Sequence, residues 1–109
     1  MAEPVNATEL LEQMKENFLP EMAANIDGVI QLKLAGEGGG DYYLELKNSS
    51  FNPQPGIHPS PNMTIAATVE DYIKISTGKL DGMMAFFQGK LKVQGDVTLA
   101  QKMQKVFKK

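Results

Sequence analysis

Hydrophobic and polar residues follow two periodicities along the chain, one typical of helices and one typical of strands. Over residues 8–18 the apolar side chains recur at helical spacing, with charged residues between them: Leu10, Leu11, Met14 and Phe18. Asn6 followed by Glu9 fits a capping pair at the start of a helix. Pro20 predicts that this helix ends there or gives way to a short second turn over 21–24. The segment therefore predicts an amphipathic helix whose apolar stripe packs on a core.

Alternating polarity then predicts strands at 29–34 and 42–47, joined by the glycine-rich segment 35–40. A hairpin is expected here, because the glycine run lacks phosphate-loop spacing and leads into a strand. Residues 48–62 hold four prolines and predict loop, with a short edge strand at 50–52.

The second half of the chain alternates between helical and extended patterns. The expected elements are a strand at 63–67, a helix capped by Thr68 and ended by Gly78, a short helix at 80–87, a strand at 90–94, and a last helix capped by Asp96 and running through Val106. Two helices between the strands at 63 and 90 form a crossover long enough for parallel neighbours. The predicted fold class is α+β, with helices covering a mixed sheet of about five strands.

Composition narrows the classes of function. The 109 residues, 42% of them hydrophobic, predict a single globular domain over 1–109, with loose ends at 1–5 and 108–109. With no cysteine, no arginine and one histidine, the chain lacks thiol chemistry, multi-histidine metal sites and bidentate anion clamps. His58 lies in the proline-rich loop and is expected to be exposed and non-catalytic. We expect no catalytic residues, no metal and no cofactor.

Charge is unevenly distributed. The net charge of −2 argues against nucleic-acid binding, yet the lysines concentrate in residues 55–109, where they suit anionic headgroups. The sequence has no basic and apolar leader, no apolar run of membrane-spanning length and no peroxisomal tripeptide at its end. These features predict a cytoplasmic location.

The densest apolar cluster is the segment Met83-Met84-Ala85-Phe86-Phe87. Methionine adapts to ligands of different shapes, so such a segment suits a lipid cavity. Packing in an ordinary core is the alternative for each side chain, because both roles use the same residue types.

The C-terminal half resembles the sterol carrier protein type 2 family, also called non-specific lipid-transfer proteins. The resemblance is strongest over 77–103 and rests on three segments: Thr77-Gly78-Lys79-Leu80-Asp81, Ala85-Phe86-Phe87-Gln88-Gly89-Lys90-Leu91-Lys92-Val93-Gln94-Gly95-Asp96, and Leu99-Ala100-Gln101-Lys102-Met103. It implies a five-stranded mixed, mostly antiparallel sheet covered by about five helices, with an apolar tunnel between them. It also implies non-covalent binding of fatty acids, acyl-CoA, sterols or phospholipids.

The resemblance assigns ligand-lining roles by position. The expected ligand-binding residues are Ile73, Met83, Met84, Phe86, Phe87, Gln88, Met103, Val106 and Phe107, with Lys90 and Lys92 at an anionic headgroup. Gln88 is expected to make a polar contact near the tunnel.

The sequence therefore predicts a non-enzymatic lipid-binding or lipid-transfer domain that contacts membrane surfaces transiently. Two alternatives stay open. One is an accessory module that presents acyl-CoA to a partner enzyme of lipid metabolism. The other is a structural or dimerisation module with a filled core.

Overall fold

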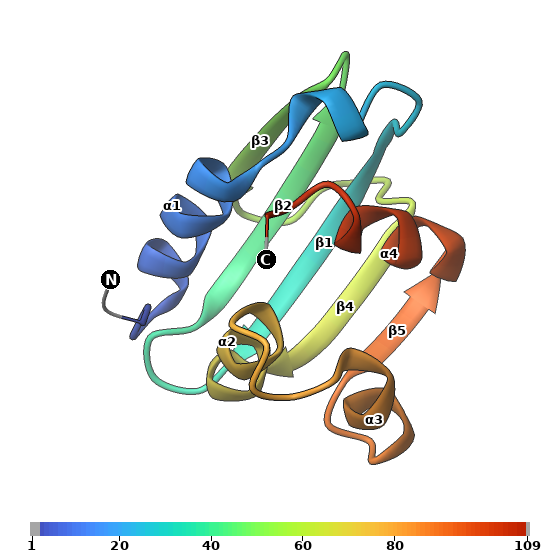
Figure 1. Ribbon diagram of the computed structural model, residues 1–109. Coiled ribbons are helices and arrows are strands. Elements are labelled where there is room, and N and C mark those ends of the chain that lie inside the picture. The colour runs from blue at the N-terminus through green and yellow to red at the C-terminus, as the bar shows by residue number, and fades with distance from the viewer. Residues whose placement is uncertain (1–2, 109) are drawn as a thin grey trace.

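The computed structural model of the chain describes residues 3–108. The described elements are, in chain order, α1 (Ala7–Asn17), the 3-10 turn η1 (Pro20–Met22), β1 (Gly28–Ala35), β2 (Gly40–Lys47), β3 (Ser50–Pro55), β4 (Met63–Thr68), α2 (Val69–Ser76), α3 (Gly82–Phe87), β5 (Lys92–Gly95) and α4 (Val97–Gln104) (Figure 1). The α+β class and the five strands agree with the prediction. Within 3–108 the helices number four, with η1 in addition, where about five were expected.

The strands form one mixed sheet in the order β3-β2-β1-β4-β5. β1 and β4 are parallel, and every other neighbouring pair is antiparallel. The crossover prediction needs correcting, because β5 returns antiparallel to β4 after α2 and α3. The parallel pair arises instead because the loop over 56–62 carries the chain past β2 and β1, so that β4 starts beside the start of β1.

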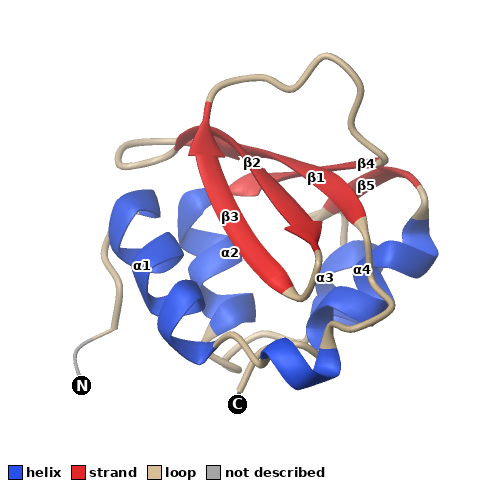
Figure 2. Ribbon diagram, turned by 90° about the horizontal axis from the view of Figure 1, so that it is seen from above, coloured by secondary structure: helices blue, strands red, loops and turns tan. Residues whose placement is uncertain are grey.

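All the described helices lie on one face of the sheet, and the loop between β3 and β4 arches over the other face (Figure 2). Alternation along the strands explains this layering. In β1, Ile30, Leu32 and Leu34 are buried under the helices, whereas Lys33 between them is exposed. We call the two surfaces of the sheet the helix face and the open face.

After β4, three element boundaries differ from the predicted ones by two residues each. α3 begins at Gly82, because the Asp81 carboxylate accepts hydrogen bonds from the Met83 and Met84 amides and caps the helix there. β5 begins at Lys92, because the amides of residues 90 and 91 donate to the carbonyl of Ala85 instead of to β4. α4 ends at Gln104 rather than continuing through Val106.

The chain after α4 turns back and pairs with the end of α1. Phe107 forms an isolated antiparallel bridge with Phe18, and the Lys108 amide donates to the Asn17 carbonyl over 2.7 Å. The ring of Phe51 from β3 completes a cluster, with centroids 5.7 Å from Phe18 and 5.1 Å from Phe107. We call these three rings the phenylalanine cluster.

The expected loose ends at 1–5 and 108–109 lie partly outside the described residues, since 1, 2 and 109 are not described. Within the described part, Pro4 is buried and Glu3 forms an ion pair with Lys79.

The open face holds a buried amide that the sequence pattern did not single out. Gln31 is 1% exposed, and its Nε2 donates to the carbonyls of Tyr42 (2.9 Å) and Gly56 (3.0 Å). Its Oε1 accepts the backbone amide of His58 at 2.8 Å. These bonds hold the β3–β4 loop against the sheet. His58 is consequently half-buried rather than exposed as predicted, and its ring stands edge-on to Tyr43.

β3 is also longer than expected, since its prolines lie on an edge strand.

Candidate functional site

The structure separates the predicted ligand-binding residues into an interior group and a surface group. The interior group lies between the helices and the sheet: Ile73, Met103, Val106 and Phe107. Val106 is fully buried and Met103 is 7% exposed, and both pack in the main core with sheet residues such as Leu32 and Ile65. Ile73 and Phe107 are half-buried against the same core.

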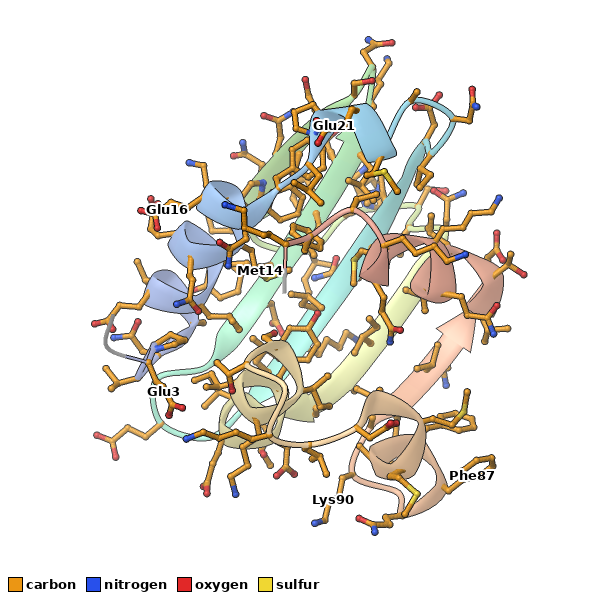
Figure 3. The ribbon with its side chains drawn as sticks, in the orientation of Figure 1. Glu3, Met14, Glu16, Glu21, Phe87 and Lys90 are labelled. Carbon is orange, nitrogen blue, oxygen red and sulfur yellow. The ribbon has the colours of Figure 1, made fainter. Side chains whose placement is uncertain are left out.

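The surface group comes from α3 and the residue that follows it. Met83, Met84, Phe86 and Phe87 are 56%, 53%, 44% and 74% exposed. Gln88 caps the C-terminal end of α3 and is exposed as well. Figure 3 shows the Phe87 side chain directed away from the body of the molecule. The structure therefore does not bring the surface group together with the interior group.

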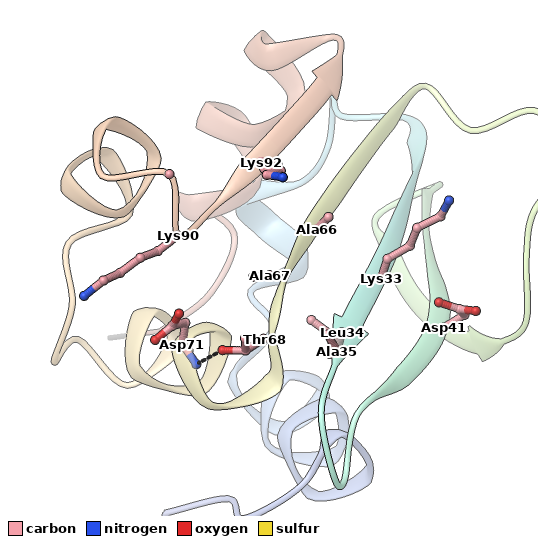
Figure 4. A pocket seen from close by; sticks show the side chains of 11 residues that line it. Lys33, Leu34, Ala35, Asp41, Ala66, Ala67, Thr68, Asp71, Lys90 and Lys92 are labelled. Atoms are coloured by element: carbon pink, nitrogen blue, oxygen red, sulfur yellow. Dashed lines mark hydrogen bonds between the residues drawn. The ribbon is translucent and has the colours of Figure 1, made fainter.

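The two lysines predicted at a headgroup lie at a different place again. Lys90 and Lys92 line a shallow groove of about 600 Å³ together with Lys33, Ala66 and Asp71. Lys33 and Ala66 belong to the open face, as their alternation with the buried Leu34 and Ile65 shows. Figure 4 shows this groove, where a hydrogen bond from the Asp71 amide to the Thr68 hydroxyl caps α2. The groove thus lies away from the four interior residues.

The interior is apolar and deformable. Among residues 3–108, the one buried residue of the polar or charged types is Gln31, and it belongs to the open face. Three methionines contribute to the core, namely Met14, Met63 and Met103, which are 8%, 1% and 7% exposed. Unbranched thioether side chains adjust to irregular shapes at little cost. Such an interior is chemically suited to an alkyl chain, and the buried residues in the described part of the chain bring no charged group into it.

Tyr72 on α2 brings a hydroxyl group to this apolar layer. It is 5% exposed, and burial raises the pKa of its hydroxyl well above the usual range. The phenol is therefore neutral at physiological pH and does not act as a base.

The remaining candidate for chemistry is His58. Its Nδ1 accepts the Ser60 amide at 3.0 Å on the open face, so this ring nitrogen is hydrogen-bonded within its own loop. Within residues 3–108, no three His, Asp or Glu side chains come together as a metal site would require. None of the described helices is long and apolar enough to cross a bilayer.

Sequence reasoning missed the partners of Phe107. It placed Phe18 in a helical stripe and Phe51 in an edge strand, and nothing in their spacing indicated that all three rings meet. Contacts between segments this far apart in sequence leave no local periodicity to detect.

Comparison with known proteins identifies the class. The SCP-2 sterol transfer family matches residues 7–108. Hydroxysteroid dehydrogenase-like protein 2 of Danio rerio is 37% identical over an alignment 109 residues long. The alignment covers 96% of this chain and 26% of that protein.

Two solved structures share the fold. Palmitated SCP2L2 from Aedes aegypti superimposes with a TM-score of 0.70 at 26% identity, covering 94% of each chain. The sec-alkylsulfatase Pisa1 from Pseudomonas sp. gives a TM-score of 0.85 at 20% identity, covering 93% of this chain and 16% of the enzyme.

The family match and the shared fold thus place the chain in the class of sterol-carrier domains. It belongs to the SCP-2 sterol transfer family, as the sequence motifs predicted. Binding and transfer of lipids, the predicted class of function, is supported at the level of that family. The chain spans about a quarter of the length of the curated relative described above.

Proposed function

We propose that the chain binds one lipid molecule between the helices and the helix face of the sheet and carries it without covalent chemistry. The observation that carries this proposal is the coincidence of a family match over 7–108 with an uncharged, methionine-containing interior. Because the Aedes relative is described as palmitated, a long-chain fatty acid is the ligand class to test first.

Burial of the acyl chain supplies the affinity. At about 0.8 kcal/mol per methylene, ten buried carbons contribute about 8 kcal/mol before ordering costs are subtracted. No directional polar contact is needed, so fatty acids, acyl-CoA, sterols and phospholipids all satisfy the interior. Ile73, Met103, Val106 and Phe107 are the proposed lining residues, since they lie on the helices and tail that cover the sheet.

The test is a titration of the delipidated chain with a fluorescent fatty acid, with palmitate as competitor. The expected result is saturation at about one molecule per chain and displacement by palmitate. Absence of saturable binding would overturn the proposal and leave a filled-core structural module as the interpretation of the fold.

A volume-filling variant locates the ligand. Met103→Trp enlarges a side chain in the interior, and we expect it to weaken fatty-acid binding at least fivefold. Met22→Trp makes the same change at a site 52% exposed on η1 and serves as the matched control. Circular dichroism of both variants shows whether they fold. Equal affinities of the two folded variants would place the ligand elsewhere.

One observation favours a second role for the same site. The relative from Danio rerio is about four times as long and is named as dehydrogenase-like. We therefore propose as an alternative that the domain presents its lipid to a partner enzyme of lipid metabolism. Faster turnover of chain-bound acyl-CoA than of free acyl-CoA by such an enzyme supports presentation, whereas equal rates argue for transfer alone.

A further inference from the structure

α3 exposes its apolar face and buries its smallest side chain. At about 100° of rotation per residue, Met83, Met84, Phe86 and Phe87 spread over roughly 160° of the helix circumference. Ala85 lies opposite the middle of that arc and is fully buried. Amphipathic helices on globular proteins usually have the reverse arrangement, with the large apolar side chains inward. We call the four exposed side chains the α3 patch.

The local structure holds this orientation. Asp81 caps the first turn through the amides of Met83 and Met84 at 2.8 and 3.2 Å. At the other end, the carbonyl of Ala85 accepts the amides of Lys90 and Leu91 at 2.9 and 3.2 Å. Both ends of α3 are therefore tied, and the α3 patch is presented outward by a defined backbone.

Positive charge flanks the α3 patch. The hydrogen bond from the Lys90 amide to the Ala85 carbonyl places that lysine directly beyond the helix, and Figure 3 shows Lys90 and Phe87 on either side of α3. Neither Lys90 nor Lys92 forms an ion pair with a residue in the range 3–108, whereas Lys79 is paired with Glu3. The opposing charge on this segment is Asp81, whose carboxylate is engaged in the helix cap, and Asp71 lies across the groove.

The size of the α3 patch distinguishes between possible occupants. Taking about 200 Å² for each large side chain, the exposed fractions correspond to about 450 Å². A stable protein interface buries about 800 Å² per partner, so α3 alone falls short of what a second copy requires. A bilayer interface needs only a shallow apolar wedge with cationic residues beside it.

We propose that α3 is the membrane-docking element of this carrier, with the α3 patch entering the interfacial layer of an anionic bilayer and Lys90 meeting its headgroups. The inference rests on the proposed function, since a carrier must meet the membranes from which it takes lipid. It also reassigns the surface group of residues, because side chains that contact bilayer lipid from outside need not line the bound ligand.

The test uses vesicles of phosphatidylcholine with a quarter phosphatidylserine, and measures how much of the chain sediments with them. The patch variant is Phe87→Ser with Met83→Ser. The matched control is Ile57→Ser with Met22→Ser, which removes one methionine and one other large apolar residue at sites 58% and 52% exposed. A third variant, Lys90→Gln, tests the charge contribution.

We expect the patch variant to bind vesicles at least tenfold more weakly than the unmodified chain, and the control variant to bind like the unmodified chain. Lys90→Gln should weaken binding about fivefold, and added salt should weaken binding of the unmodified chain. Equal vesicle binding of patch and control variants overturns the inference. The inference also fails if the patch variant still binds vesicles but no longer self-associates, while the unmodified chain and the control variant do. That result would assign the surface to a second copy.

Fatty-acid titration of the same variants separates this inference from the proposed function. Loss of vesicle binding with fatty-acid affinity within twofold of the unmodified chain supports α3 as a docking element. If the patch variant loses fatty-acid affinity but still binds vesicles, α3 lines the ligand and the docking role is overturned. If the unmodified chain binds vesicles but no fatty acid, the proposed function fails and the docking surface stands.

Discussion

At the scale of single residues, the most constrained polar side chain is Gln31. Its amide group is buried and satisfied on both sides, and its three strong hydrogen bonds all go to backbone atoms. A buried amide of this kind specifies one position for the loop above it, because any displacement leaves polar groups without partners. Gln31 thus fixes the middle of this loop, while the Gly56 and Asn62 amides tie its two ends to backbone carbonyls of the sheet region.

Replacement of that amide tests its contribution. Gln31→Leu should lower the free energy of unfolding by about 2–4 kcal/mol, because the Tyr42 and Gly56 carbonyls and the His58 amide lose a partner. Urea unfolding measures the change, and hydrogen exchange at the His58 amide should accelerate. Gln94→Leu is the control, since Gln94 is exposed on β5. A Gln31→Leu variant as stable as this control would contradict the assigned role.

Tyr72 makes stability depend on pH in the alkaline range. The phenol titrates near pH 10 in the unfolded chain, and burial raises its pKa in the folded chain. The contribution of Tyr72 to the free energy of unfolding is therefore complete below pH 10. It declines above pH 10, because the unfolded chain releases the proton and the folded chain retains it. We expect a loss of up to about 1.4 kcal/mol per pH unit from this group.

Urea unfolding of the unmodified chain and of Tyr72→Phe between pH 7 and 11 measures this dependence. The stability of the variant should fall less steeply above pH 10, because phenylalanine has no proton to release. Parallel curves for the two proteins would show that Tyr72 titrates alike in both states.

At the scale of elements, the turn between β5 and α4 depends on a glycine. Gly95 has φ +96°, and a Cβ at this position would lie 2.5 Å from the Asn62 carbonyl oxygen. Gly89, which follows α3, has φ +77°, and beyond its chain neighbours no atom lies within 4 Å of the place that a Cβ would take. The two positions share a backbone conformation that favours glycine, and they differ in the space around it.

This difference predicts unequal costs for the same substitution. Gly89→Ala should lower the free energy of unfolding by about 1 kcal/mol, from backbone strain alone. Gly95→Ala should cost about 2–4 kcal/mol, because strand β4 must also move away from the new methyl group. Thermal unfolding of both variants gives the comparison, and equal losses would contradict the close approach.

The local sequence pattern was sufficient to predict most helices and strands, but it was insufficient to predict which elements pair or pack with one another. Periodicity, caps and glycines placed α1, β1, β2, β4 and α2 to within a few residues, since these signals act over one or two turns. The parallel pairing of β1 with β4 depends on the path of a loop, which its composition does not specify. The orientation of α3 also escaped prediction, because the same apolar residues suit an inward or an outward face.

At the scale of the whole molecule, the two surfaces of the sheet carry different groups of residues. The helix face carries the apolar layer and the phenylalanine cluster, whereas the open face carries Gln31, its loop and the lysine-lined groove. The predicted headgroup lysines belong to the open face, whereas the interior group of predicted ligand-binding residues belongs to the helix face. A ligand that used both would have to pass around the edge at β5, and α3 stands beside that edge (Figure 1).

The bridge between Phe18 and Phe107 has a consequence for the order of folding. It joins segments separated by nearly the whole described chain, so it closes the largest loop in the molecule and forms with the greatest entropic cost. During synthesis, the hairpin of β1 and β2 can pair early, but the helix layer stays unsealed until residue 107 leaves the ribosome. Until that bridge forms, the rings of Phe18 and Phe51 lack their third partner, and this side of the apolar interior is exposed to solvent.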